Sequence, residues 1–74
     1  MDHVIGAIQT YYEIELDDVA DELRSGKYGK LSDCPSYRSA KAMLEAIRVL
    51  ERAYYGEGRT VNIREEMRYR GFAV

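Results

Sequence analysis

Residues 36–55 read SYRSAKAMLEAIRVLERAYY and carry the clearest periodic pattern in the chain. Their apolar side chains recur every three or four positions, as Ala40, Met43, Leu44, Ile47, Leu50 and Tyr54. An α-helix has about 3.6 residues per turn, so this spacing places the side chains in one stripe along one face. The stretch therefore predicts one long central helix, against which the rest of the chain packs.

The other side of this predicted helix is charged. It carries Lys41, Glu45, Arg48 and Arg52, at spacings of four, three and four residues. Side chains at such spacings are neighbours on a helix, so Glu45 can pair with Lys41 or with Arg48. We expect these residues to form a ladder of charges on the solvent side.

The N-terminal part predicts two shorter helices. From Asp2 to Tyr12, apolar residues again recur at three- and four-residue intervals, which favours a helix. Residues 13–16, EIEL, interrupt this pattern, and Asp17 and Asp18 then offer side-chain oxygens that can cap a second helix. That helix would stop at Gly26, because glycine is a common residue at helix ends. We therefore expect an acidic helical hairpin at the N-terminus.

Two further segments follow from turn and capping signals. Residues 26–35 contain two glycines and a proline and have no periodicity, which predicts a long, mobile loop. The sequence Gly56-Glu57-Gly58 ends the central helix. Asn62, followed three residues later by Glu65, resembles a capping box and predicts a last short helix that ends before Gly71.

The predicted elements indicate an all-α fold. Residues 59–63 could instead form a short strand, because Thr, Val and Ile favour strands, but the sequence offers no convincing partner strand. We expect a small four-helix domain that resembles helix-turn-helix proteins and has one long central helix. Residues 1–74 form one domain, since a chain of this length has room for a single small core.

The sequence also bears on localisation. No apolar run approaches the roughly 18 residues that a membrane-spanning helix needs, and the N-terminal residues lack the basic and apolar regions of a signal peptide. Cys34 is the only cysteine, so no disulfide within the chain can stabilise the fold, as is usual in reducing compartments. We therefore expect a cytoplasmic protein that does not contact a membrane.

Charge is divided along the chain, although the net charge is only −2. Residues 1–23 contain seven acids and no Lys or Arg, whereas residues 24–74 contain all eleven basic residues and six acids. Asymmetry of this kind indicates an interaction surface. A structural interpretation is equally open, in which the two parts fold onto each other and neutralise their charges.

No catalytic centre is predicted. The only histidine, His3, and the only thiol, Cys34, could form a nucleophile–base pair only if the N-terminus docked on the loop. A zinc site lacks ligands, and the acids of residues 17–22 lack the spacing and the turn glycine of a calcium loop. Residues 26–30, GKYGK, lack the Walker spacing of phosphate-binding loops. We expect a non-enzymatic protein with no metal ion, no cofactor and no small-molecule substrate.

Two segments resemble the C-terminal DNA-binding domain of the bacterial replication initiator DnaA. Residues 8–19, IQTYYEIELDDV, look like its opening, where a helix that ends in two aromatic residues leads through a short turn into an acid-capped helix. Residues 38–47, RSAKAMLEAI, are similar to the long helix that follows there. The resemblance covers residues 4–50 and implies a helix-turn-helix-like scaffold, but the family's recognition helix has no match. The family's basic stretch is reduced here to Arg24, Lys27 and Lys30.

The seven tyrosines divide into two predicted groups. We place three of them at core positions, namely Tyr11, Tyr12 and Tyr54. We expect the others to be exposed, namely Tyr28, Tyr37, Tyr55 and Tyr69. Exposed tyrosine beside arginine is typical of binding surfaces, so this second group belongs to the candidate site.

Our first hypothesis is a regulatory protein that docks on a partner protein, for example in the transcription or replication machinery. Small proteins of this type are often encoded by phages or mobile elements. The charge division motivates the hypothesis, because complementary charge speeds the encounter of two proteins and sets their register. The candidate partner-binding residues are Glu13, Glu15, Asp17, Asp18, Asp21, Glu22, Tyr28, Tyr55 and Tyr69.

The alternative hypothesis is a DNA-binding module of helix-turn-helix type, in which basic side chains contact phosphates. The candidate nucleic-acid-binding residues are Lys27, Lys30, Arg38, Lys41, Arg48, Arg52, Arg64 and Arg68. Against this alternative stands the acidic N-terminal segment, which repels phosphate unless it faces away from the DNA.

Overall fold

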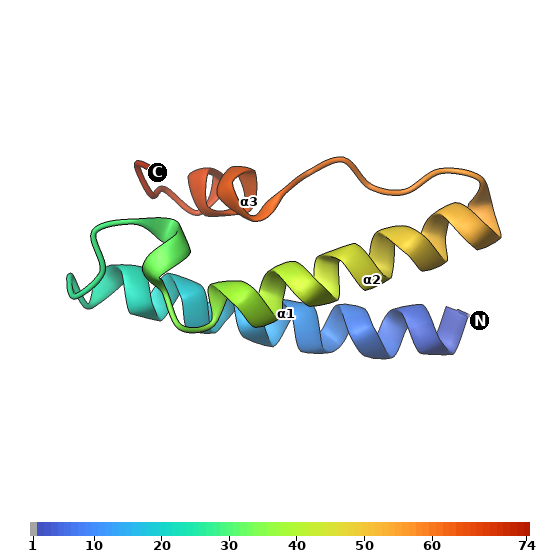
Figure 1. The fold of residues 1–74 in the computed structure, drawn as a ribbon, viewed down its shortest axis with the longest axis horizontal. Coiled ribbons are helices and arrows are strands. Elements are labelled where there is room, and N and C mark those ends of the chain that lie inside the picture. Colours follow the sequence, from blue (N-terminus) through green and yellow to red (C-terminus); the bar gives the residue numbers. More distant parts are fainter. Residues whose placement is uncertain (1) are drawn as a thin grey trace.

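A computed structural model describes residues 2–74, and all regular elements within that range are helical. The elements are α1 (Asp2–Arg24), the short 3₁₀ helix η1 (Leu31–Asp33), α2 (Tyr37–Tyr55) and α3 (Ile63–Tyr69). In Figure 1, α1 and α2 run antiparallel beside each other, and an extended segment then returns along the pair to α3. The molecule measures 39 × 18 × 17 Å. The predicted all-α fold class is confirmed.

Helix α1 is one continuous helix, so the predicted N-terminal hairpin is wrong. Tyr12, Leu16 and Val19 are all fully or almost fully buried, and their spacings of four and three residues continue the helical period. The buried stripe thus runs without a change of phase through the stretch expected to break the helix. Asp17 and Asp18 lie exposed in the middle of α1 and cap no helix. Residues 2–74 accordingly contain three α-helices and not the four expected.

The central helix is confirmed as α2, within one residue of the predicted start. It ends at Gly56, which has a φ of 81° and donates its backbone N–H to the carbonyl of Arg52. A left-handed residue at this position favours glycine. Ile47 is fully buried, but Tyr54 is 54% exposed, so the placement of Tyr54 in the core is wrong. The helix extends one turn beyond the part of its apolar stripe that the core covers.

The last helix, α3, begins as the capping signal predicted. The side chain of Asn62 accepts a hydrogen bond of 2.9 Å from the backbone N–H of Glu65. The helix ends at Tyr69, and Gly71 follows with a φ of 95°. No residue of the described part of the chain lies in a strand, and residues 59–62 are extended and unpaired by any sheet. The alternative of a strand over residues 59–63 is therefore wrong.

The loop between α1 and α2 belongs to the core. Its element η1 buries Leu31, and Cys34 directly after it is 3% exposed. The carboxylate of Glu22 accepts hydrogen bonds from the backbone N–H of Ser36 at 2.9 Å and from its hydroxyl at 2.6 Å. The loop therefore packs inward, and Glu22 joins the end of α1 to the start of α2.

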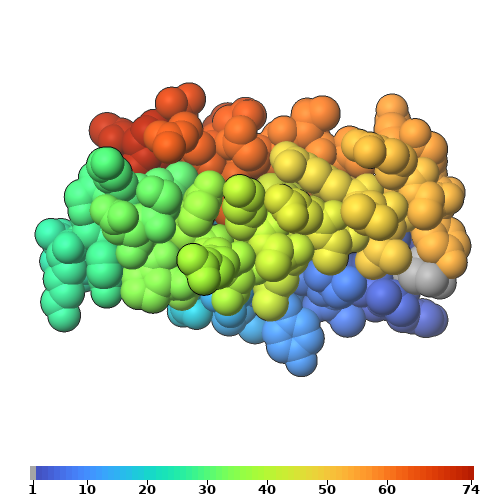
Figure 2. Space-filling model, viewed as in Figure 1, coloured from blue at the N-terminus to red at the C-terminus, as the bar shows by residue number. Residues whose placement is uncertain are grey.

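One core joins all the elements. It consists of Tyr12, Leu16, Val19, Ala20, Leu31, Cys34, Ala40, Leu44, Ile47, Ile63 and Met67. Figure 2 shows the resulting arrangement from one side, with α2 across the middle, α1 along one edge and the C-terminal segment along the opposite edge. Within residues 2–74, none of the helices combines the length and the apolar composition that a bilayer crossing requires.

Candidate functional site

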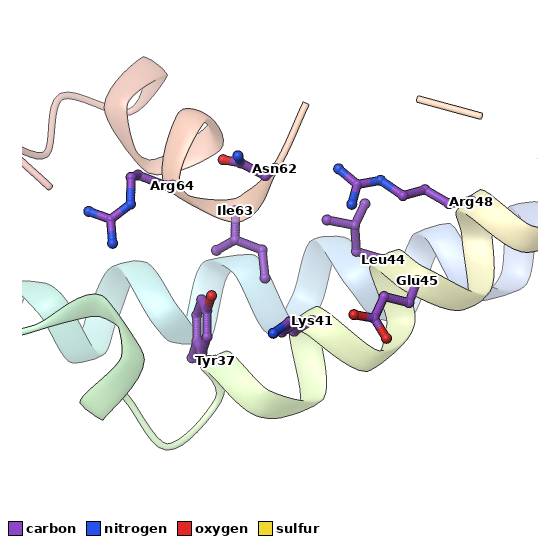
Figure 3. A pocket seen from close by; sticks show the side chains of 8 residues that line it. All are labelled: Tyr37, Lys41, Leu44, Glu45, Arg48, Asn62, Ile63 and Arg64. Atoms are coloured by element: carbon purple, nitrogen blue, oxygen red, sulfur yellow. The ribbon is translucent and has the colours of Figure 1, made fainter. Parts of the chain in front are cut away.

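A groove of about 150 Å³ lies between α2 and the start of α3 (Figure 3). Its lining residues are Tyr37, Lys41, Leu44, Glu45, Arg48, Asn62, Ile63 and Arg64. Leu44 and Ile63 are buried and form an apolar floor, whereas Lys41, Glu45 and Arg64 are exposed at the rim. Five of its eight lining residues are charged or carry an amide, so the groove is more polar than the mostly apolar pockets that bind small molecules.

Arg48 fixes one wall of the groove. Its Nε–H donates to the carbonyl of Arg59 at 3.0 Å. Its Nη2 donates to the carbonyls of Thr60 and Val61, both at 3.2 Å. The guanidinium thus holds three successive carbonyls of the extended segment that leads to α3. Arg48 was a candidate phosphate ligand, but the structure gives it a structural task.

A close backbone approach accompanies this contact. A Cβ atom at Gly58 would lie 3.0 Å from the carbonyl oxygen of Arg48 and 3.3 Å from its Cα. Both atoms belong to the backbone of a helix and cannot easily move. The extended segment can therefore lie this close to α2 only because residue 58 has no side chain.

Arg59 ties the same segment to both long helices. It donates to the carboxylate of Glu51 through its backbone N–H, its Nε and its Nη2, at 3.0 to 3.1 Å. Its Nη2 also donates to the side-chain carbonyl of Gln9 on α1 at 3.3 Å. The hydrogen bonds from Arg59 hold the pKa of Glu51 below its usual value, and those with Glu51 raise the pKa of Arg59. This pair is charged at neutral pH and holds the extended segment against α2.

The rim of the groove is predominantly positive. Its lining contains Lys41, Arg48 and Arg64 against the single acid Glu45. Within residues 2–74, neither Lys41 nor Arg64 forms an ion pair. Two exposed cations that form no ion pair therefore stand beside an apolar floor, with the single acid Glu45 near them.

The acids predicted to bind a partner are partly engaged inside the molecule. Arg70 contacts the carboxylates of Asp17 at 2.7 Å and Glu13 at 3.8 Å, and Arg24 pairs with Asp21 at 3.0 Å. Glu22 bonds to the start of α2, as described above. Glu15 is half-buried, and Asp18 is exposed. The structure spreads these acids around α1 and does not gather them into one face.

The candidate tyrosines are not brought together either. Tyr28 is half-buried and packs against the core, as does Tyr37, so the expectation that both are exposed is wrong. Tyr55 and Tyr69 are exposed as expected, at 59% and 78%. They lie at opposite ends of the molecule, because α2 and α3 end at opposite ends (Figure 1). The hydroxyl of Tyr55 bonds to the carboxylate of Asp2, and this bond raises the pKa of Tyr55.

The candidate DNA-binding residues also occupy several places. Lys27 and Lys30 are exposed in the loop, and Arg38 and Arg52 are exposed on α2 outside the groove. Arg68 donates from its Nε to the backbone carbonyl of Val74 at 2.7 Å. Of this candidate set, the groove brings together Lys41, Arg48 and Arg64.

The sequence interpretation missed the apolar floor of the groove. Leu44 was assigned to the core stripe, and Ile63 was considered only as part of a possible strand. The capping signal at Asn62 located the start of α3, but no local pattern showed that this start would lie against α2. Arg59, which had no assigned role, also escaped notice because its partners Gln9 and Glu51 are distant in the sequence.

The thiol of Cys34 lies in the core. Cys34 is 3% exposed, and burial raises the pKa of its thiol. Among residues 2–74, no three His, Cys, Asp or Glu side chains are grouped so that they could hold a metal ion. Comparisons with protein-family models, with curated proteins and with solved structures find no match to this chain.

Proposed function

We propose that this protein is a non-enzymatic docking module whose α2–α3 groove binds an acidic segment of a partner protein. One observation carries the proposal: two exposed cations that form no ion pair within residues 2–74, Lys41 and Arg64, stand beside a buried apolar floor. A partner's carboxylates would pair with these cations while an apolar side chain covers the floor. Charge pairs around a desolvated anchor are a common arrangement in protein interfaces.

The size of the groove supports a protein partner over a small molecule. Its volume is about 150 Å³. Sites for small ligands usually enclose about 300–1,000 Å³. A hollow of this size suits a single anchoring side chain, with the remaining contacts made on the surface around it. The fixed position of Arg48 keeps the wall preformed, which reduces the entropic cost of binding.

Duplex DNA is the competing ligand class, because the same cations could contact phosphates. The arrangement of charges favours the protein partner. Arg48 donates its hydrogen bonds to the backbone, which leaves only Lys41 and Arg64 among the groove cations for phosphate contacts. The acidic helix α1 belongs to the same small body and opposes the approach of a polyanion.

The class of partner is inferred only from the sequence resemblance. The resemblance of residues 8–19 and 38–47 to the DnaA domain motivates a partner in the transcription or replication machinery, and a cytoplasmic location would match it. In this chain α1 runs through residues 8–19 without the turn that the DnaA family has. A regulatory role in that machinery is therefore part of the proposal.

Fluorescence anisotropy tests the groove. The probes are a short labelled peptide of alternating Glu and Leu, the same peptide with Lys in place of Glu, and a labelled DNA duplex. We expect the acidic peptide to bind best, and the double variant Lys41→Glu/Arg64→Glu to weaken it at least tenfold, which corresponds to about 1.4 kcal/mol.

The matched control is Arg38→Glu/Arg52→Glu, which changes the net charge equally but lies outside the groove. It should reduce the affinity far less. Equal binding of the Lys peptide, or equal effects of the two double variants, would refute the groove as the site. Preference for DNA, lost in Lys41→Glu/Arg64→Glu, would support the DNA-binding alternative.

A further inference from the structure

Helix α1 carries a second apolar stripe that the molecule leaves exposed. Val4, Tyr11 and Ile14 are 46%, 61% and 50% exposed. Together with the exposed Ala7 they follow spacings of three, four and three residues, so they form one line along the helix. This exposed stripe is distinct from the buried one through Tyr12. Monomeric proteins seldom expose large apolar side chains in a continuous row.

Helix α2 carries a complementary stripe. Its exposed residues Ala42, Ala46, Val49 and Ala53 follow spacings of four, three and four, and Val49 is 67% exposed. Three of these four side chains are single methyl groups, which leave a shallow furrow along the helix. Helices pack when a ridge of larger side chains on one enters a furrow on the other. The stripe of α1 is such a ridge.

Both stripes lie on the side of the helix pair that faces away from α3. The side chains of α1 that bond to arginines of the C-terminal segment are Gln9, Glu13 and Asp17. Glu22 marks the side of α1 that faces α2, through its bonds to Ser36. Successive residues are turned by about 100°, so Val4 points the same way as Glu22, and Ala7 and Tyr11 lie roughly 120–160° away from Glu13, which faces the C-terminal segment.

The same reasoning places the stripe of α2. Arg48 and Glu51 face the extended segment, and Ile47 is buried in the core. At about 100° per residue, Val49 and Ala53 point away from both of these directions. In Figure 1 the extended segment and α3 lie on one side of the α1–α2 pair, and no element of residues 2–74 covers the opposite side.

Charge is arranged unevenly on this open face. Because α1 and α2 are antiparallel, the apolar half of α1 lies beside the last turns of α2 (Figure 1). At the other end, the stripe of α1 continues with the exposed acids Asp18 and Asp21, next to the first turn of α2, where Arg38 is exposed. The face therefore has an apolar half and a charged half.

We propose that two copies of this chain associate through the open face, with α1 of each copy packed against α2 of the other. A twofold axis parallel to the helices produces this arrangement. The ridge of Val4, Tyr11 and Ile14 then enters the alanine furrow of the second copy, and Asp18 and Asp21 approach its Arg38. The product is a four-helix bundle in which neighbouring helices are antiparallel, a common stable architecture.

Charge complementarity selects this arrangement over the other symmetric one. A twofold axis across the helices would place α1 on α1 in reversed direction, so that the charged half of each face would meet the apolar half of the other. With α1 on α2, the exposed acids Asp18 and Asp21 of one copy face the exposed Arg38 of the other. Opposite charges across an interface favour one register and disfavour the alternative.

The open face reaches the lower end of the size range of specific dimers. Two adjacent helices, each about 10 Å across and about 30 Å long, present roughly 600 Å² of flat area. Two such faces give about 1,200 Å², and specific interfaces bury about 1,200–2,000 Å² in total. The groove of the proposed function lies on the other side, so dimerisation leaves it free and does not depend on it.

Sedimentation equilibrium tests the dimer. We expect a monomer–dimer equilibrium in the micromolar range, and Tyr11→Glu and Ile14→Glu should each raise the dissociation constant at least tenfold. Tyr69→Glu is the matched control, because Tyr69 is 78% exposed but lies on α3, and it should leave the dimer intact. Circular dichroism should show unchanged helix content, since all three side chains are exposed.

A charge swap tests the register. Asp18→Arg and Arg38→Asp should each weaken the dimer, and the two together should restore it. A chain that stays monomeric to millimolar concentration, or a dimer that Ile14→Glu leaves unchanged, would overturn the proposal, and a swap without restoration would overturn the α1-on-α2 register. Lys41→Glu/Arg64→Glu should not change the dimer, so failure of the proposed groove and failure of the dimer are distinguishable.

Discussion

The α1–α2 pair and the C-terminal segment, residues 57–74, are held in the fold by different kinds of contact. The pair is joined mainly by apolar side chains, of which Leu16 and Ile47 have no exposed surface. The C-terminal segment buries only Ile63 and Met67 among its described side chains, packs Phe72 and Val74 partly against the core, and is otherwise attached by polar contacts. The comparison shows that one small core can position a segment that contributes little to it.

Arginines supply the polar attachments of that segment. Arg48 of α2 holds its carbonyls, Arg59 binds Glu51 and Gln9, and Arg70 contacts Glu13 and Asp17 of α1. The division of charge along the sequence is thus used in part inside the molecule, where a basic C-terminal residue meets the acidic helix. Among the exposed cations that form no ion pair within residues 2–74, Lys41 and Arg64 are the ones that line the groove.

The largest effect should come from the apolar contacts of the pair. Ile47→Ala removes a fully buried side chain and should reduce the free energy of unfolding by about 2–5 kcal/mol. Urea unfolding followed by circular dichroism measures it. Tyr69→Ala, at a side chain 78% exposed, is the control and should change stability by about 0.5 kcal/mol or less. A loss below about 1 kcal/mol for Ile47→Ala would show that the pair does not depend on its apolar contacts.

The attachment of the C-terminal segment should be weaker and local. Arg48→Met keeps the apolar stem but leaves three carbonyls of residues 59–61 without their donor. We expect a loss of about 2 kcal/mol, in the range for hydrogen bonds to charged groups. Hydrogen exchange should accelerate in α3 more than in the core of α1. Arg52→Met, at an exposed position of α2, should change neither quantity, and equal acceleration everywhere would contradict a local attachment.

The smallest effect at neutral pH concerns Tyr12, where the two regions meet. The Tyr12 side chain is 1% exposed, and its hydroxyl has no hydrogen-bond partner within residues 2–74. Tyr12→Phe removes this unpaired group and should stabilise the protein by up to about 1 kcal/mol near pH 7. Urea unfolding of both proteins at the same pH measures the difference, and a clear destabilisation would contradict an unpaired hydroxyl.

The same variant has a defined pH dependence. Burial, with a smaller contribution from Glu66, raises the pKa of Tyr12 from 10.0 to about 12. The unfolded chain therefore loses this proton first, so the contribution of Tyr12 to stability is complete below pH 10 and is lost as the pH rises to about 12. The difference between the two proteins should grow by about 2–3 kcal/mol over that interval. Parallel pH profiles would show that the Tyr12 hydroxyl is not buried.

The elements that the sequence predicted well are those with local signals. The limits of α2 follow from an uninterrupted apolar period and from Gly56, and the start of α3 follows from Asn62 and Glu65. Each of these signals acts between residues less than a turn or two apart. They hold in the fold because no long-range contact opposes them.

The error in α1 has a physical reason in its two stripes. Val4 and Tyr11 belong to the exposed stripe, and Ile5 and Tyr12 belong to the buried one. If the residues of both stripes are assigned to one apolar face, the helical period ends at Tyr12 and Ile14 does not fit it. The buried stripe alone continues the period through Leu16 and Val19. Which stripe is buried depends on where α2 and α3 pack, and local sequence does not contain that information.

The candidate site was predictable only in part. Lys41, Arg48 and Arg64 were all named as basic candidates, but their meeting in one groove depends on the path of residues 59–61. That path is set by the hydrogen bonds of Arg48 to residues 11 to 13 positions away. Only the structure shows that Arg48 has a structural role, whereas Lys41 and Arg64 are exposed.

The contacts of Arg59 and Arg70 with α1 also have a kinetic consequence. They join residues 50 and 53 positions apart, whereas the contact of Glu22 with Ser36 joins residues 14 positions apart. Closing a longer loop costs more chain entropy, so the α1–α2 pair can form its folding nucleus before α3 docks. Unfolding would then begin with the release of α3, and the groove would be the first part of the surface to disappear.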